Sequence, residues 1–306
     1  MRKTTEERIA RLFTDVEATV RLHAVDVCSG REISVAADEQ VVLASVFKIL
    51  LVLEFARQAA AGQIDPRERV LLSAADRLGG WGTAGCADDV EMSLRDLAYF
   101  TMSVSDNSAA DALMRRIGVD TVRLLAAELG LDRTRVVGGP RELLRSMFED
   151  AGARDEAEFA ASYPGLDPQR IRGFRALDPE RTTSGTARDV TLLLRLIWQD
   201  RAGPAAACAW VRDLMARQAF RHRLASGFPD GVLVSAKTGT LPGRHIEAGV
   251  VRYPDGGEYA VAVFAETAGL APGQAAVDSA IGRAARIAVD DLRSAASGAD
   301  RPLGPA

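Results

Sequence analysis

Apolar positions alternate with polar ones near both ends of the chain and recur at helical spacing in between. Alternation with a period of two predicts strands, whereas apolar residues at i, i+3 and i+4 predict amphipathic helices. Two strands are predicted near the N-terminus, over 20–28 and 31–36, with a Ser29-Gly30 turn between them. Three more are predicted near the C-terminus, over 232–238, 246–253 and 259–266. The turn Pro254-Asp255-Gly256-Gly257 indicates a hairpin between the last two.

Helical spacing fills the rest of the chain, except for residues 137–181, where no pattern dominates. Helices are predicted over 5–16, 45–61, 93–103, 108–117, 119–129, 186–200, 204–219 and 272–296. This order predicts an α+β fold of two domains, in which terminal helices flank an antiparallel sheet and an all-α domain is inserted. The sheet domain is expected to comprise residues 1–39 and 204–306, and the helical domain residues 40–203. Residues 297–306 are expected to be a disordered tail.

Composition excludes several classes of protein. The 38 Lys and Arg and 42 Asp and Glu residues give a net charge of −4, without a basic stripe, so no nucleic-acid partner is predicted. No apolar stretch approaches the ~20 residues of a membrane span, and the N-terminus does not resemble a signal peptide. A cytoplasmic protein without a membrane partner is expected. The three cysteines are far apart, which argues against a disulfide framework or zinc site; no metal or cofactor is predicted.

Lysine is rare in this chain. All but three of the basic residues are arginine, and the lysines are Lys3, Lys48 and Lys237. Arginine supplies surface charge equally well, but it does not lose its proton inside a protein. A lysine retained against such a bias is a candidate for a position that needs an amine. Lys3 lies in the N-terminal segment without a neighbouring motif, so attention falls on Lys48 and Lys237.

Ser45 and Lys48 begin a strongly apolar helical segment. Residues three apart share a helix face, so the lysine amine is expected beside the serine hydroxyl. Burial among Ile49, Leu50 and Leu51 would lower the lysine pKa, and a neutral amine can accept the proton of the hydroxyl. Alternatively, Ser45 is a simple N-cap and Lys48 extends its amine to solvent.

Two further polar motifs follow. Ser105-Asp106-Asn107 lies in a turn between two predicted helices, where it also suits an ordinary N-cap. Lys237-Thr238-Gly239-Thr240 ends a predicted strand, where the lysine could be a surface charge and the glycine a bulge. The histidines His23, His222 and His245 are spread over a strand, a helix end and a hairpin, so no Ser-His-Asp arrangement is indicated.

Together the three motifs resemble the S-x-x-K, S-D-N and K-T-G elements of the serine β-lactamases and penicillin-binding proteins. Ser105 follows Ser45 by 60 residues, as in the class A branch, and the resemblance extends along nearly the whole chain. It implies an acyl-enzyme on Ser45, formed from a β-lactam or a related amide or ester that carries a carboxylate. A D-alanyl peptidase, esterase or transacylase of the same superfamily is an alternative. A penicillin-binding sensor without turnover is an alternative of another class.

The resemblance also implies a role for each motif residue. Lys48 would take the proton of Ser45, Ser105 would pass a proton to the leaving nitrogen, and Asn107 would bind the substrate amide. Lys237 and Thr238 would hold the substrate carboxylate, and Gly239 and Thr240 would continue the same substrate-binding stretch. The N–H groups of Ser45 and Thr240 would form the oxyanion hole. Arg244 and Trp81 are further candidates for contact with the substrate.

One element of the class A pattern is missing. Those enzymes activate the deacylating water with a glutamate in an E-x-x-L-N arrangement, which this sequence lacks. The interval from Ser105 to Lys237 is longer than in that branch, and the extra length falls around residues 140–180. Glu142 is at a suitable distance from Asn107 to serve as the base. It also suits an exposed glutamate at a helix start.

Overall fold

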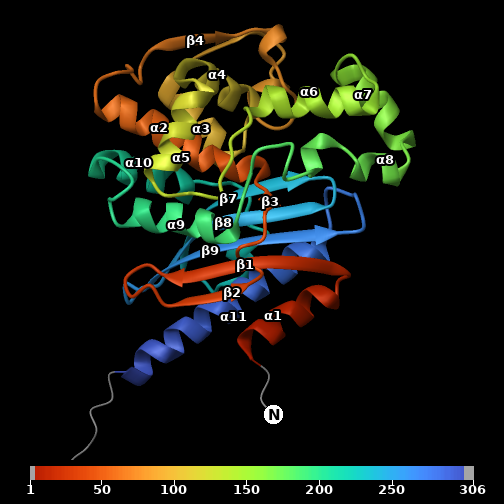
Figure 1. Cartoon of the computed structure of the whole chain (residues 1–306). Coiled ribbons are helices and arrows are strands. Elements are labelled where there is room, and N and C mark those ends of the chain that lie inside the picture. The colour runs from red at the N-terminus through yellow and green to blue at the C-terminus, as the bar shows by residue number, and fades with distance from the viewer. Residues whose placement is uncertain (1–3, 300–306) are drawn as a thin grey trace, which may run out of the picture.

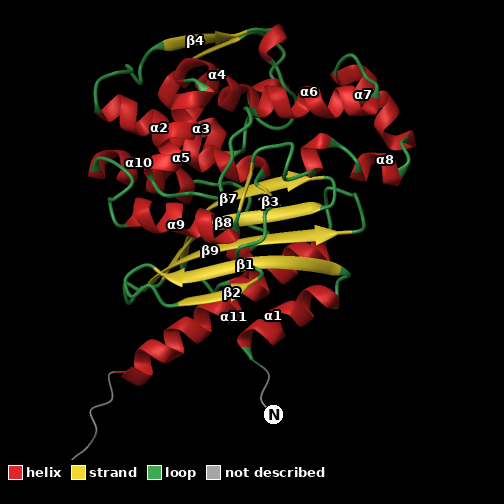
Figure 2. Cartoon of the chain, in the orientation of Figure 1, coloured by secondary structure: helices red, strands yellow, loops and turns green. Residues whose placement is uncertain are grey.

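The computed structural model describes residues 4–299 and shows a five-stranded antiparallel sheet with helices on both faces (Figures 1 and 2). The strand order is β2-β1-β9-β8-β7, and every neighbouring pair is antiparallel. The N-terminal and C-terminal segments thus share one sheet, and the predicted α+β class is confirmed. The strands of the sheet are β1 (Ala18–Asp26), β2 (Glu32–Val35), β7 (Leu233–Leu241), β8 (Arg244–Arg252) and β9 (Glu258–Thr267).

The terminal helices cover one face of this sheet. Helix α1 (Thr5–Thr14) begins at Thr4, whose side chain accepts a hydrogen bond from the Glu7 N–H while the Glu7 carboxylate caps the Thr4 N–H. Helix α11 (Ala275–Ala299) lies beside it beneath the sheet (Figure 1). Their apolar side chains form one cluster with the side chains that β1, β7 and β9 place on this face of the sheet. Residues 297–299 belong to α11, three residues into the expected tail, and residues 300–306 lie outside the described part of the chain.

The remaining helices lie on the opposite face of the sheet. They are α2 (Lys48–Ala60), α3 (Leu94–Ser103), α4 (Asn107–Ile117), α5 (Val119–Glu128), α6 (Pro140–Ala151), α7 (Glu156–Ser162), α8 (Pro168–Arg172), α9 (Ala187–Trp198) and α10 (Ala205–Ala216). Their apolar cluster continues into Ile246, Ala248 and Phe264 of the sheet. One core therefore joins the helices to the sheet, and the boundary between residues 40–203 and the rest stays a prediction.

Helix α2 is at the centre of this helical layer. Its residues Ile49 to Phe55 have exposed fractions of 7% or less, so the helix is apolar on nearly all sides. At 25 cal/mol per Å², burial of each large side chain of this kind contributes about 1.5–3 kcal/mol. The segment that carries Ser45 and Lys48 is therefore held rigidly by packing.

Two short pairs of strands have no counterpart in the sequence prediction. Strand β3 (Val41–Val42) pairs with β6 (Ser184–Gly185), and β4 (Arg69–Leu72) pairs with β5 (Val90–Ser93). The first pair holds the segment before Ser45 against the segment that ends the ambiguous region 137–181. That region contains α6, α7 and α8, which lie at one side of the helical layer (Figure 1).

Candidate active site

Ser45 lies in a short 3-10 turn, η1 (Ala44–Phe47), that leads directly into α2. Ala44 adopts a left-handed conformation with φ of 45°, which costs a non-glycine residue of order 1 kcal/mol. No described residue within 4–299 forms a hydrogen bond with the Ser45 side chain, and neither η1 nor α2 has a side-chain cap. The interpretation of Ser45 as an N-cap is therefore wrong, and its hydroxyl is available at the surface of a cleft.

Lys48 is buried, with 1% of its surface exposed. Its Nζ donates to the backbone oxygen of Ser105 at 2.8 Å and to Asn107 Oδ1 at 2.8 Å. The Asp106 carbonyl lies 3.3 Å from Nζ, and Ser105 Oγ lies 3.4 Å from it. The amine is thus held against the Ser105-Asp106-Asn107 turn, and the alternative in which it extends to solvent is wrong.

Burial of its amine lowers the pKa of Lys48 from its ordinary value to about 7, although the Asp106 carboxylate acts in the opposite direction. At neutral pH a large fraction of the amine is then unprotonated. A neutral amine has two N–H groups and one lone pair. The two bonds of 2.8 Å satisfy the N–H groups, and the lone pair is left for a hydroxyl proton.

The turn at residues 105–107 combines one residue that caps a helix with two residues that accept hydrogen bonds from Lys48. Asp106 is the N-cap of α4, since its Oδ1 accepts from the Ala109 N–H. Its Oδ2 accepts from the Thr83 N–H and anchors the loop that carries Trp81. Ser105 has a φ of 62°, which turns its carbonyl to Lys48. The N-cap interpretation is therefore correct for Asp106. It does not explain Ser105 and Asn107, which instead accept hydrogen bonds from Lys48.

Lys237 lies on β7 and is fully buried, so the interpretation as a surface charge is wrong. Its Nζ donates to the Thr238 carbonyl at 2.9 Å. Burial lowers the pKa of Lys237 well below its ordinary value, and the positive charges of Lys48 and Arg223 act in the same direction. Glu247, on the neighbouring strand, opposes this shift.

A buried amide fixes the backbone next to Lys237. Gln218 Oε1 accepts from the Thr238 N–H at 2.6 Å, and its Nε2 donates to the Glu247 carboxylate at 2.6 Å. The same carboxylate also accepts from the Leu224 N–H. No motif in the sequence pointed to Gln218 or Glu247, because Gln218 is one polar residue among several arginines and Glu247 is a lone acid within a strand.

Gly239 allows β7 to approach the turn that carries Ser45. A Cβ atom built on Gly239 would lie 3.2 Å from the Leu43 oxygen and 3.3 Å from the Ser45 nitrogen. The strand and the turn therefore meet by backbone contact, which places the Thr240 residue beside Ser45. Close approach, and not a bulge, is the reason for glycine at this position.

Comparison with known proteins agrees with the family resemblance that the three sequence motifs indicate. The family model described as the beta-lactamase enzyme family matches residues 4–292. The chain belongs to the beta-lactamase enzyme family. A beta-lactamase regulatory protein, BlaB, of Streptomyces cacaoi is 32% identical over 285 residues, which cover 88% of this chain and 91% of that protein.

Solved structures of the family share the fold. A beta-lactamase from Sphaerobacter thermophilus superposes with a TM-score of 0.74 at 24% identity, covering 94% of this chain and 96% of that chain. A class A beta-lactamase from Mycobacterium abscessus gives a TM-score of 0.76 at 19% identity, covering 96% of this chain and all of that chain. The predicted resemblance is therefore confirmed.

Within this family fold, the cleft at Ser45 has two lobes. The polar lobe, about 470 Å³, is lined by Ser45, Gly80, Trp81, Ser105, Asn107, Phe220, His222, Arg223, Thr238, Thr240, Pro272 and Gly273. The apolar lobe, about 380 Å³, contains residues of α6 and α7. The lobes share Ser45, Gly80, Asn107, Thr240 and Pro272. The structure thus brings together Ser45, Lys48, Ser105, Asn107 and the Lys237–Thr240 stretch.

Trp81 also reaches the cleft. Its ring lies 6.2 Å from that of Phe220, measured between centroids, and both rings line the polar lobe. The Trp81 side chain remains exposed, with 69% of its surface accessible. Phe220 was not predicted as a cleft residue, because it lies in the loop between α10 and β7, where no periodic pattern distinguishes it.

Arg223 is a second cleft residue that sequence reasoning missed. It is 2% exposed, and its Nε donates to Asp278 Oδ1 at 2.6 Å. Its other nitrogens donate to the Gly239 and Ile246 carbonyls and to Thr240 Oγ1, at 2.9–3.0 Å. Arg223 therefore holds the end of β7 in place and brings a positive charge to the polar lobe.

Arg244 and Glu142 are not brought to the polar lobe. Arg244 forms an ion pair with Glu266 at 2.9 Å and lines two other pockets, away from Ser45. The Glu142 carboxylate accepts from the Gly139 N–H at 2.8 Å and caps α6, as the alternative interpretation expects.

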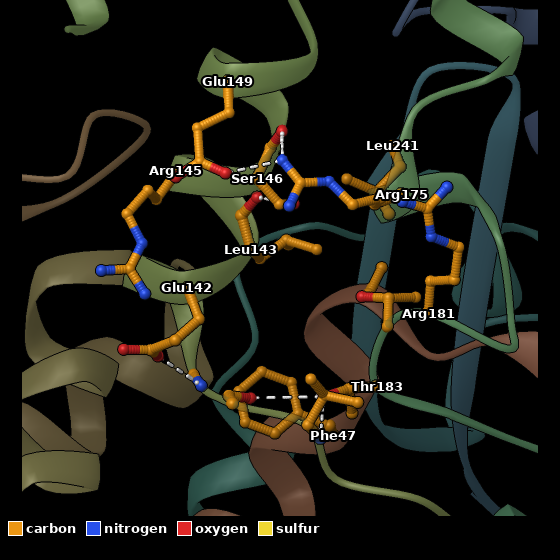
Figure 3. Close-up of a pocket in the computed structure, with 15 residues that line it drawn as sticks. Phe47, Glu142, Leu143, Arg145, Ser146, Glu149, Arg175, Arg181, Thr183 and Leu241 are labelled. Atoms are coloured by element: carbon orange, nitrogen blue, oxygen red, sulfur yellow. Dashed lines mark hydrogen bonds and ion pairs between the residues drawn. The ribbon is translucent and has the colours of Figure 1, made fainter. Parts of the chain in front are cut away.

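Glu142 lines a separate cavity of about 290 Å³ between α6 and the segment around Arg175 and Arg181 (Figure 3). In this cavity the Arg175 side chain crosses to Glu149 of α6, and Phe47 forms part of the opposite wall (Figure 3). Ser45 is not among the residues that line it.

No helix within residues 4–299 is both long and apolar enough to cross a membrane. Nowhere in the same range do three or more His, Cys, Asp or Glu side chains gather in a way that could hold a metal ion.

Proposed function

We propose that Ser45 is an acyl-accepting nucleophile and that Lys48 is its base, with a β-lactam or a related strained amide or ester as substrate. The observation that carries this proposal is the buried Lys48 amine, with a pKa of about 7, held 3.4 Å from Ser105 Oγ at the start of the helix that bears Ser45. An amine in this state accepts a proton at neutral pH.

The acylation step balances without any cofactor. The Ser45 proton passes to the neutral Lys48 amine, directly or through Ser105, as Oγ bonds to the carbonyl carbon. The N–H groups of Ser45 and Thr240 stabilise the developing oxyanion. The lactam C–N bond then breaks, and its nitrogen takes the proton from Lys48 by way of Ser105. Because the ring opens without losing a fragment, the adduct keeps the full mass of the β-lactam.

The polar lobe is the proposed site for the substrate carboxylate. Ser105, Thr238 and Thr240 supply hydroxyl groups there, and Arg223 and Lys237 supply positive charge or N–H donors behind them. Trp81 would cover the ring system of the substrate. Asn107 would donate from its amide nitrogen to the carbonyl of the acyl amide.

Release of the acyl group is expected to be slow. Among the described residues that line the two lobes, the only carboxylate is Glu156, an exposed residue at the start of α7. The Glu142 carboxylate caps α6 and lines another cavity. This supports a second candidate, a penicillin-binding protein that is acylated without rapid turnover. The relationship to a protein named as a beta-lactamase regulatory protein supports the same candidate.

Intact mass spectrometry and a chromogenic cephalosporin test these functions. Incubation with benzylpenicillin is expected to add the full mass of the drug to the wild type and nothing to Ser45→Ala. Continuous colour development would support a hydrolase, and a long-lived adduct without turnover would support the sensor. Turnover of a nitrophenyl ester without a penicillin adduct would favour an esterase. Absence of adduct and turnover with every probe would contradict Ser45 acylation.

A further inference from the structure

Much of the apolar lobe is lined by α6 and α7, in the region around residues 140–180 where this sequence is longer than the class A pattern. Pro140, Leu143, Leu144 and Met147 line it from α6, at positions i, i+3, i+4 and i+7 of one helix face. This face is only partly covered by the core, because Leu143 and Leu144 are half-buried. An apolar helix face that borders a cavity beside a nucleophile is a binding surface for an apolar group.

An aromatic cluster forms the far wall of the lobe. The ring of Phe148 lies 5.1 Å from that of Phe159, and the ring of Phe159 lies 5.1 Å from that of Tyr163. All three rings line the lobe and are partly exposed. Helices α6 and α7 lie side by side at one edge of the helical layer (Figure 1), so this wall is made by residues 140–163 alone.

The two lobes differ in the charge of the side chains that line them. The described residues that line the polar lobe include Arg223 and His222, whereas those of the apolar lobe include no arginine, lysine or histidine. The one charged residue of the apolar lobe is Glu156, which contacts Gly79. A substrate with an anionic end and an apolar end therefore has one favourable orientation across Ser45.

We propose that the apolar lobe binds the acyl group of the substrate and selects large apolar, especially aromatic, acyl groups over small or anionic ones. This inference rests on the proposed acylation of Ser45. The anionic end occupies the polar lobe, and Asn107 and Thr240, which line both lobes, lie at the junction where the acyl amide passes. Burial of each acyl methylene is expected to raise the acylation rate about four-fold.

Three penicillins with the same nucleus test the inference. The rate of adduct formation is measured by intact mass for 6-aminopenicillanic acid, which lacks an acyl group, for benzylpenicillin, and for its α-carboxy derivative. Benzylpenicillin is expected to react at least about ten-fold faster than either of the others, because only its side chain is both large and uncharged. Equal rates for the three would overturn the inference while leaving Ser45 acylation intact. Absence of adduct with all three would instead contradict the proposed function.

Matched variants locate the effect. Leu144→Asn and Phe159→Ala are expected to lower the rate for benzylpenicillin about ten-fold and to leave the rate for 6-aminopenicillanic acid within about two-fold. Glu156→Gln is expected to raise the rate for the α-carboxy derivative specifically. The control is Leu124→Asn, at a 70% exposed position on α5 outside the lobe. Unchanged selectivity in folded Leu144→Asn and Phe159→Ala would overturn the assignment of the lobe.

Discussion

Lys48 Nζ donates to Asn107 Oδ1 at 2.8 Å, across a separation of 59 residues in the chain. This bond orients the Asn107 amide, because its oxygen faces the lysine and its nitrogen is left for another partner. A Cβ built on Gly80 would lie 3.3 Å from Asn107 Nδ2, so that nitrogen lies toward the cleft. The proposed base and the proposed amide-binding residue are therefore in direct contact, and a change in either alters the charge or the direction of the other.

The pH dependence of acylation follows from the pKa of Lys48. Burial lowers this pKa to about 7, and the neutral amine is the form proposed to accept the Ser45 proton. The rate of benzylpenicillin adduct formation is therefore expected to rise with pH, with an apparent midpoint near 7, and to level off above it. The rate is measured by rapid mixing and quenching at a series of pH values, followed by intact mass spectrometry. A flat profile between pH 5.5 and 9 would exclude Lys48 as the base.

Gly239→Ala tests the contact between β7 and the turn that carries Ser45. The added Cβ would meet the Leu43 oxygen and the Ser45 nitrogen, so the strand must move away from Ser45. Acylation is expected to slow by at least about ten-fold, because a displacement of the Thr240 N–H weakens the oxyanion hole. The control is Gly165→Ala, where a Cβ has no atom within 4 Å. Equal rates in both variants would show that this close approach is unimportant for acylation.

Glu142→Gln distinguishes a capping glutamate from a catalytic base. The carboxylate caps the Gly139 N–H, so the variant is expected to lose about 0.5–1 kcal/mol of unfolding free energy. The lifetime of the benzylpenicillin adduct is expected to stay within about two-fold of the wild type. Urea unfolding and adduct decay measure the two effects. An adduct that becomes at least about a hundred-fold longer-lived would instead identify Glu142 as the water-activating base.

Arg223→Met is expected to destabilise the protein strongly. Loss of the guanidinium from the buried pair with Asp278 leaves that carboxylate with His245 and His222 as its neighbours, at a cost of up to about 3–5 kcal/mol. Its bonds to the Gly239 and Ile246 carbonyls are lost as well. Arg221→Met is the matched control, since Arg221 is exposed and donates to a single carbonyl, that of Val234. Similar melting temperatures for the two variants would contradict a structural role for Arg223.

The sequence predicted the parts of the fold that depend on local periodicity. The five strands of the sheet, the terminal helices and the buried helix at Lys48 each have a clear apolar pattern, and their predicted positions agree with the structure to within a few residues. The pairs β3–β6 and β4–β5 were missed because a strand of two to four residues carries too little pattern, and its pairing depends on a distant segment.

The motifs of the candidate site could be located in the sequence because their lysines are unusual in this chain. Lysine is rare, and Lys48 and Lys237 each lie within a recognisable motif. Arg223 is one arginine among many, so nothing in the sequence distinguishes it. The apolar face of α6 has regular spacing, but the charged residues around it and the prolines at 164, 168 and 179 obscured the pattern. Whether that face packs inside the core or borders a cavity depends on tertiary structure alone.

Asn107→Asp tests the coupling between the amide and the base most directly. The new carboxylate would lie against the Lys48 amine at hydrogen-bond distance, where Asn107 Oδ1 lies now. A neighbouring negative charge favours the protonated amine, so the pKa of Lys48 is expected to rise. The midpoint of the acylation profile should then shift upward by about one unit or more, and the rate at pH 7 should fall at least about ten-fold.

Asn107→Ala separates this charge effect from the loss of the amide. It also removes the amide N–H that faces the cleft, but it introduces no charge beside the amine. Its rate should therefore fall at every pH without an upward shift of the midpoint. If Asn107→Asp and Asn107→Ala gave the same midpoint, the proton acceptor for Ser45 would be a group other than Lys48.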